Sequence, residues 1–275
     1  MTGSPTGHWS FLGEDEARLC QAFMEHGHAV FPAEDPAALT AIRALAAERA
    51  ATCLGVPLPD DHGAFLDGIH RQVDPARLNA FRLAVIQGLN ADPLFRRRYH
   101  ALAVRALAAI AGNELAMQRR INLSIQLPDD DSSLLPVHAD VWSGDSPFEV
   151  VLWVPLVDCF ATKSMYLMPP AADRAMQDRL AEFAGRDAED LYRAIADQAA
   201  FLDVPFGSVL LFSQNLMHGN RVNRESSTRW SMNCRFKAVL APYGDKRLGE
   251  FFEPLVIRPA TRLGMQFSLP RGFDA

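Results

Sequence analysis

The sequence contains few cysteines, no long apolar run and no repeat. Its four cysteines are scattered through 275 residues without a Cys-X-X-Cys pair, which favours reduced thiols over a disulfide framework or a cysteine zinc site. No apolar run reaches the about 18 residues that a membrane helix needs. Residues 1–9 lack the charged start and apolar core of a secretory signal peptide. We therefore predict a cytoplasmic protein that does not span a membrane.

An excess of positive charge is also absent. The chain has 27 Lys and Arg against 33 Asp and Glu, for a net charge of −6, whereas nucleic-acid-binding proteins usually carry a basic surface. We therefore expect no nucleic-acid partner. With 49% hydrophobic residues, the chain is long enough to bury a large core in one domain. The C-terminal tail, from about residue 246, can complete either a substrate pocket or the contact of a homodimer, and the sequence does not decide between them.

Helical patterns dominate the first part of the chain. Apolar spacing predicts a helix over residues 14–26 and a short strand over 28–31. An aspartate followed by proline is typical of a helix start, and the chain has such a pair at positions 35–36, 74–75 and 92–93. These pairs predict helices that extend to about residues 52, 89 and 110. A further helical segment, over residues 171–200, interrupts the later strands. It is either a lid over the mouth of the barrel or a surface insertion that packs against the rest of the protein.

From residue 119 the hydrophobic period changes to two. Polar and apolar residues alternate over 120–127 and again over 229–236, so each segment predicts a strand with one polar and one apolar face. Residues 148–157, 164–168 and 209–212 predict further strands. The two polar faces fit either solvent-facing edge strands or the lumen of a barrel whose outer face packs against helices.

A candidate metal site lies at His138-Ala139-Asp140 and His218. Side chains two positions apart on a strand share a face, so His138 and Asp140 can bind one ion that His218 completes. Two imidazoles and one carboxylate suit Fe(II) and leave coordination positions open. Arg229, on the next predicted strand, can hold a carboxylate through its forked guanidinium. Ser231 faces the same way as Arg229.

The order His138-X-Asp140, His218, Asn223 and Arg229-X-Ser231 resembles the Fe(II)/2-oxoglutarate-dependent oxygenases, in particular the phytanoyl-CoA dioxygenase-like branch. The C-terminal half is also similar to oxygenases encoded in bacterial carbohydrate and aminoglycoside biosynthesis clusters. The resemblance implies an α+β fold with a double-stranded β-helix (jelly-roll, cupin-like) core, packed N-terminal helices and a helical insertion between strands. It also implies Fe(II), with 2-oxoglutarate and O2 as cosubstrates.

The resemblance implies the division of the chain and its site residues. A single catalytic domain, 1–275, would comprise a mainly helical support (1–115), the β-helix core (116–240) and a C-terminal extension (241–275). The expected metal-binding and catalytic residues are His138, Asp140 and His218. The expected cosubstrate-binding residues are Arg229, Ser231, Gln126, Asn122 and Lys163, the last of which lies where the family often carries an Asn-Gly pair. Trp142 and Asn223 are the candidates for substrate contact.

The implied reaction is hydroxylation or oxidation of a small molecule, with release of succinate and CO2. The resemblance favours a sugar, an aminocyclitol or a sugar-derived natural product as substrate. Two alternatives stay open. A cupin-type isomerase or dioxygenase would use the metal without 2-oxoglutarate, and Arg229 would then be dispensable. A non-catalytic sugar-binding relative would be expected to have a damaged triad, whereas all three ligands are present.

Overall fold

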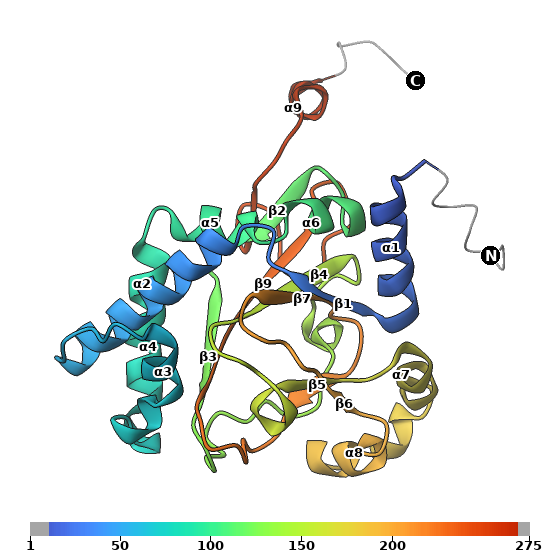
Figure 1. Cartoon of the computed structure of the whole chain (residues 1–275). Helices are drawn as coiled ribbons and strands as arrows, with labels where there is room; N and C mark the ends of the chain where they lie inside the picture. The colour runs from blue at the N-terminus through green and yellow to red at the C-terminus, as the bar shows by residue number, and fades with distance from the viewer. Residues whose placement is uncertain (1–10, 269–275) are drawn as a thin grey trace.

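Antiparallel strands in two sheets form the centre of the computed structural model, which describes residues 11–268 (Figure 1). The segment 1–9, for which no signal peptide is expected, lies outside the described residues. The larger sheet has the order β1 (His28–Pro32), β7 (Ser208–Ser213), β4 (Glu149–Pro155), β9 (Arg229–Ala238), β2 (Leu115–Gln118) and β10 (Phe252–Pro254), with β3 (Asn122–Gln126) also paired to β9. The smaller sheet has the order β6 (Ala200–Phe201), β5 (Met165–Leu167) and β8 (His218–Asn220).

The two alternating segments of the sequence pair with each other. In the β3–β9 register, Asn122 lies opposite Asn233, and Ser124 lies opposite Ser231. These polar residues face the interior between the sheets, where they line a cavity. The alternate residues, including Trp230, are buried in the main hydrophobic core. Of the two alternatives that the sequence left open, the structure therefore shows the polar lumen with an apolar outer face, and not solvent-facing edge strands.

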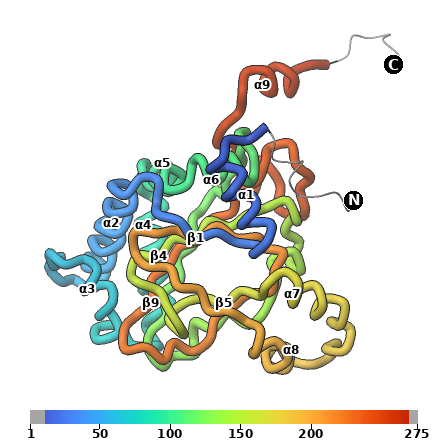
Figure 2. The backbone as a smooth tube through the Cα atoms, turned by 45° about the vertical axis from the view of Figure 1, so that its right-hand side comes forward, coloured from blue at the N-terminus to red at the C-terminus, as the bar shows by residue number. Residues whose placement is uncertain are grey.

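Helices cover the apolar face of the larger sheet. This layer contains α2 (Pro36–Leu54), α3 (His62–Asp67), η2 (Ile69–Arg71), α4 (Pro75–Ala91), α5 (Phe95–Ala101) and α6 (Val104–Ile110), and α2–α4 lie together on one side of the strands in Figures 1 and 2. Trp230 on β9 fixes the contact: its indole Nε1 donates to the carbonyl of Leu66 at 2.9 Å, and its ring meets the ring of Phe81 edge-on at 6.0 Å. Tyr99 Oη donates to the carbonyl of Leu152 at 2.7 Å.

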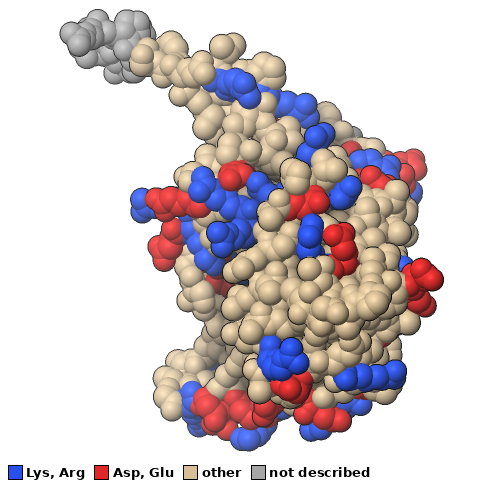
Figure 3. All heavy atoms as spheres, turned by 90° about the vertical axis from the view of Figure 1, so that its left-hand side faces the viewer, with Lys and Arg blue, Asp and Glu red and all other residues tan. Residues whose placement is uncertain are grey.

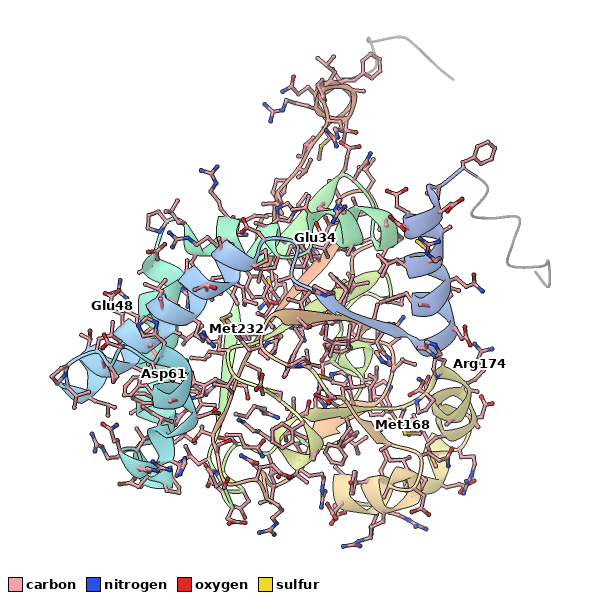
Figure 4. The ribbon with its side chains drawn as sticks, viewed as in Figure 1. Glu34, Glu48, Asp61, Met168, Arg174 and Met232 are labelled. Atoms are coloured by element: carbon pink, nitrogen blue, oxygen red, sulfur yellow. The ribbon has the colours of Figure 1, made fainter. Side chains whose placement is uncertain are left out.

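The predicted aspartate caps form at two of three positions. Asp35 and Asp74 accept hydrogen bonds from backbone N–H groups of their first helical turns. The single helix expected after Asp92 is wrong, because the Asp92 carboxylate accepts from Leu94 N in a local turn and the chain breaks again before α6. Glu34, labelled in Figure 4, accepts from the backbone N–H groups of Arg105 and Ala106. This carboxylate from a distant segment starts α6 as a separate helix.

The helical insertion connects β5 to β6. It contains α7 (Pro170–Gln177), η5 (Leu180–Phe183) and α8 (Ala188–Ile195), and it forms a second hydrophobic cluster with residues of the smaller sheet. Arg221, just after β8, forms an ion pair with Glu189 at 2.6 Å and stacks over Tyr192 at 3.9 Å. Residues 171–200 contribute nothing to the described cavity wall, which favours a packed excursion over a lid.

Two helices, one near each end of the described chain, complete the fold. Helix α1 (Glu14–His26) packs beside β1 and α6, whereas α9 (Pro259–Gln266) lies apart from the other elements in both ribbon views. None of the described helices is long and apolar enough to cross a membrane. On the helical face drawn in Figure 3, blue and red side chains lie in mixed groups, and neither the positive nor the negative residues form a patch that extends across the face.

Candidate metal centre

A short antiparallel bridge brings the two predicted histidine ligands together. The backbone N–H of His138 donates to the carbonyl of His218 at 3.0 Å, and the reciprocal bond is 2.8 Å. The ring centroids are therefore only 4.3 Å apart. Asp140 does not continue a regular strand, contrary to the expectation, because it begins the 3-10 turn η3 (Asp140–Ser143). The extended conformation of Ala139 still turns the His138 and Asp140 side chains toward the same point.

The three side chains have the spacing of a metal site. Asp140 Oδ1 lies 3.4 Å from His138 Nε2 and 3.9 Å from His218 Nε2, and one ligand atom from each residue lies within 4.8 Å of the others. Ligand atoms bound at about 2.1 Å to a common ion lie about 3 Å apart. A small inward movement of the side chains would therefore complete the coordination of one ion.

Backbone carbonyls orient both imidazoles. His138 Nδ1 lies 2.8 Å from the carbonyl oxygen of Pro136, and His218 Nδ1 lies 2.8 Å from that of Leu216. Because a carbonyl only accepts, each Nδ1 must carry the proton and donate it. Each Nε2 then presents its lone pair toward Asp140, which is the tautomer that a metal ligand requires.

The protonation states also suit a metal. Burial and the neighbouring His138 lower the pKa of His218 to about 4, against the opposing charge of Asp140, so this imidazole is neutral at pH 7. Burial alone would raise the pKa of Asp140, but His138, Arg235 and His218 outweigh it and hold the pKa well below its usual range. A neutral imidazole and an ionised carboxylate are the forms that bind metal ions.

Arg235 fixes the metal-binding carboxylate, which sequence reasoning did not foresee. Its Nη2 donates to Asp140 Oδ2 at 2.8 Å, which leaves Oδ1 directed at the two histidines. Its Nε lies 3.1 Å from Gln214 Oε1 and 3.2 Å from Asp145 Oδ1, and Lys246 binds the other oxygen of Asp145. The only sequence signal was the place of Arg235 on the polar face of β9.

The triad opens into a cavity of about 580 Å³ between the two sheets. Its wall comes from α4, β3, β4, β5, β7, β8, β9 and the loop around residues 132–135. Phe212 lies edge-on to the His218 ring at a centroid distance of 5.1 Å, so an apolar side chain shields one side of the metal site. The cavity therefore has room for organic ligands next to the ion.

Arg229 lies on the same cavity wall as a buried cation without a carboxylate partner. It is 3% exposed, and its Nη2 donates to Ser124 Oγ at 2.9 Å and its Nη1 to the carbonyl of Ser164 at 3.3 Å. Within residues 11–268, no carboxylate forms an ion pair with it, and both its Nε and Ser231 Oγ lack hydrogen-bond partners. Burial lowers the pKa of Arg229 to about 10, so it remains charged at neutral pH. Unpaired buried charge is costly, and a ligand carboxylate fits this position.

The remaining expected cosubstrate residues divide into two groups. Asn122 lines the cavity, where its Nδ2 donates to Asn233 Oδ1 at 2.9 Å. Gln126 is buried outside the cavity wall and donates to the carbonyl of Arg221 at 2.6 Å. Lys163 is also outside it, because its ammonium is bound to Asp67 and to Ser227 Oγ.

Neither candidate substrate residue lies on the cavity wall. Asn223 is fully buried, and its Nδ2 donates to the carbonyl of Ser227 at 2.8 Å, so it supports the loop before β9. Trp142 is 43% exposed on the outside of η3. The structure thus brings together the triad, Arg229, Ser231 and Asn122 among the ten predicted site residues.

No protein-family model and no curated protein sequence matches the chain. Solved structures do match it. The non-haem alpha-ketoglutarate-dependent carbocyclase SnoK from nogalamycin biosynthesis is 20% identical, with 90% of this chain and 97% of SnoK covered at a TM-score of 0.54. The chain therefore has the fold of this enzyme. HygX from Streptomyces hygroscopicus, with nickel and 2-oxoglutarate bound, is 15% identical over 86% of this chain and 90% of HygX, also at 0.54.

A third similar structure is a nickel complex of the non-haem monooxygenase ThoJ. It is 16% identical and covers 82% of this chain and 79% of ThoJ at a TM-score of 0.51. Together the three structures confirm the predicted α+β fold with a double-stranded β-helix core. At these identities the likeness establishes the fold, and the chemistry has to be argued from the residues of this chain.

Proposed function

We propose that the protein is a non-haem Fe(II)/2-oxoglutarate-dependent oxygenase that hydroxylates or otherwise oxidises a small molecule, with succinate and CO2 as coproducts. One observation carries the proposal: a metal-competent triad and the unpaired cation Arg229 open onto the same cavity. A cavity that binds a metal at one point and a carboxylate at another suits a keto acid that does both.

Each residue has a defined task in this proposal. His138, His218 and Asp140 Oδ1 bind the ion from one side, and Arg235 holds Asp140 Oδ2 away from it. Arg229 receives the distal carboxylate of 2-oxoglutarate in a forked contact, with Ser231 Oγ as a further donor. When bound, Fe(II) and 2-oxoglutarate supply the oxidising chemistry, whereas the protein supplies orientation and a secluded cavity.

The similar structures support this assignment. HygX was solved with nickel and 2-oxoglutarate bound, and SnoK is described as an alpha-ketoglutarate-dependent enzyme from nogalamycin biosynthesis. We extend the proposal to a substrate from natural-product metabolism, either a sugar or another hydroxylated molecule. The support on the protein side is the set of amide and hydroxyl groups on the cavity wall, which suit hydroxylated ligands: Asn79, Asn122, Ser132, Ser133, Asn220 and Asn233.

Anaerobic titration of the Fe(II)-loaded protein with 2-oxoglutarate tests the proposal without knowledge of the substrate. We expect the weak visible charge-transfer band of the iron chelate in the wild type and in the control His26→Ala, which changes an exposed residue of α1. We expect no band in His218→Ala. Iron binding without a band would favour the cupin-type alternative, and failure to bind iron would refute the metal site itself.

A further inference from the structure

The cavity wall is strongly biased in charge. It carries three arginines, Arg82, Arg229 and Arg235, but Asp140 is the one carboxylate among its described residues. Arg235 contacts two carboxylates, Asp140 on the wall and Asp145 behind it, and it shares Asp145 with Lys246. If the proposed function holds, the divalent ion and Arg229 carry three positive charges, which Asp140 and dianionic 2-oxoglutarate balance. Among the described residues, Arg82 is then the one arginine of the wall that contacts neither a protein carboxylate nor the proposed carboxylate of 2-oxoglutarate.

Arg82 is held in place by neutral groups. It lies on α4, where its Nη2 donates to Asn79 Oδ1 at 2.8 Å and its Nη1 to the carbonyl of Leu123 at 3.4 Å. In the described part of the chain, no carboxylate lies within ion-pair distance of its guanidinium. Because a guanidinium has five N–H donors, most of its hydrogen-bonding capacity is free. These contacts orient Arg82 at the cavity wall but leave its charge for a ligand.

Hydroxyl-binding groups surround the same part of the wall. Asn122 and Asn233 form an amide pair across β3 and β9, with a distance of 2.9 Å between Nδ2 and Oδ1. Asn79 lies one helical turn before Arg82 on α4 and also lines the cavity. Amides both donate and accept hydrogen bonds, so they suit the hydroxyl groups of a polyol.

We propose that Arg82 is the anion-binding residue of the substrate site, and that the substrate is a hydroxylated small molecule with a carboxylate or phosphate group. This inference rests on the proposed function and narrows its substrate class. Sugar acids and sugar phosphates fit the site. Amino sugars and aminocyclitols do not, because an ammonium group would meet an unneutralised guanidinium and no available carboxylate.

Isothermal titration calorimetry on the protein loaded with Ni(II) and saturating 2-oxoglutarate tests this preference. Nickel prevents turnover, and 2-oxoglutarate blocks Arg229 and the metal, so that added anions can reach only the substrate site. The probes are glucuronate, glucose 6-phosphate, glucose and glucosamine, which share a pyranose ring. We expect at least one of the two anions to bind at least tenfold more tightly than glucose, and glucosamine to bind most weakly.

Variants of Arg82 test whether this residue causes the preference for anionic sugars over glucose. Arg82→Gln should weaken binding of the preferred anion at least tenfold with little effect on glucose, and Arg82→Lys should retain part of the preference. Arg77→Gln is the matched control, because Arg77 is exposed on the same helix and does not line this cavity. The difference between the two anions distinguishes a carboxylate from a phosphate as the preferred group.

Three results would overturn the inference: no binding of either anion, binding of glucosamine as tight as that of the anions, or an anion preference that persists in Arg82→Gln. The 2-oxoglutarate charge-transfer band of the Fe(II) protein separates the two proposals. If the band forms in both wild type and Arg82→Gln but the anion preference is missing, only the substrate subsite fails. If the wild type gives no band, the proposed function itself fails.

Discussion

Replacement of Arg229 by methionine removes the cation that is proposed to bind the distal carboxylate of 2-oxoglutarate. Methionine has a similar reach but no charge and no N–H donor. The cupin-type alternative predicts no change in 2-oxoglutarate binding. The oxygenase proposal predicts a large loss, because Arg229 is 3% exposed and water cannot replace its contacts.

The size of the loss follows from the burial of the contact. Truncation of one partner of a buried, hydrogen-bonded charge pair costs about 2–5 kcal/mol. At about 1.4 kcal/mol per factor of ten, the dissociation constant of 2-oxoglutarate should rise by roughly 30-fold to several thousand-fold. Arg229→Lys keeps the charge but loses the forked geometry, so it should give a smaller loss.

The same substitution should affect the stability of the ligand-free protein very differently. Arg229 has no carboxylate partner among the described residues, so methionine removes an unpaired buried charge along with two hydrogen bonds. These effects oppose each other, and the free energy of unfolding should change by less than about 1 kcal/mol. Calorimetric titration of the Ni(II) protein with 2-oxoglutarate measures the binding, and urea denaturation measures the stability.

The control is Arg224→Met, because Arg224 is a surface residue that pairs with exposed Asp129. It should leave the dissociation constant of 2-oxoglutarate unchanged. A dissociation constant for Arg229→Met within threefold of the wild type, with the protein folded, would refute the cosubstrate role of Arg229.

Three further predictions concern the metal site and the core. Lys246→Met should weaken Ni(II) binding by about tenfold or more, because Asp145 would then draw Arg235 away from Asp140. The exposed control Arg247→Met should bind Ni(II) like the wild type. An unchanged Ni(II) affinity in Lys246→Met would contradict this role of Lys246. Trp230→Ala should lower the free energy of unfolding by about 3–5 kcal/mol in urea denaturation, and a loss below about 1 kcal/mol would count against its role in joining helices to sheet. In the folded, metal-free protein the pKa of His218 is about 4, below its ordinary value of 6.5. Between these two pH values the unfolded chain therefore binds more protons than the folded protein. The free energy of unfolding should fall as the pH drops from about 6.5 to about 4. Urea denaturation at several pH values in that range should show that the free energy of unfolding depends less steeply on pH in His218→Asn than in the wild type. An unchanged pH dependence would assign the effect to other groups.

The period of two predicted one polar and one apolar face on each of two strands, but it did not decide whether the polar faces meet solvent or line a lumen. In β3 and β9 most polar residues line the cavity, among them Asn122, Ser124 and Ser231, whereas the apolar residues between them belong to the main hydrophobic core. The aspartate caps at Asp35 and Asp74 were predictable for a similar reason, since a cap depends on neighbours within three residues. Local patterns therefore gave the sheet faces and most helix starts correctly.

Features that depend on distant contacts were not predictable. The break between α5 and α6 depends on Glu34, which is far away in the sequence. Lys163 looked suitable for a cosubstrate, but the fold places Asp67 and Ser227 around its ammonium. The contact from Arg235 to Asp140 likewise joins β9 to a turn that precedes β4. Long charged side chains reach several possible partners, and only the folded structure selects among them.

A crystal structure of the protein with Ni(II) and 2-oxoglutarate would show whether the triad and Arg229 bind one keto acid between them. We expect one ion bound by His138 Nε2, His218 Nε2 and one oxygen of Asp140, with the distal carboxylate of 2-oxoglutarate on the Arg229 guanidinium. Anomalous scattering would locate the nickel independently of the protein coordinates. An ion bound elsewhere, or 2-oxoglutarate bound without contact to Arg229, would contradict the account.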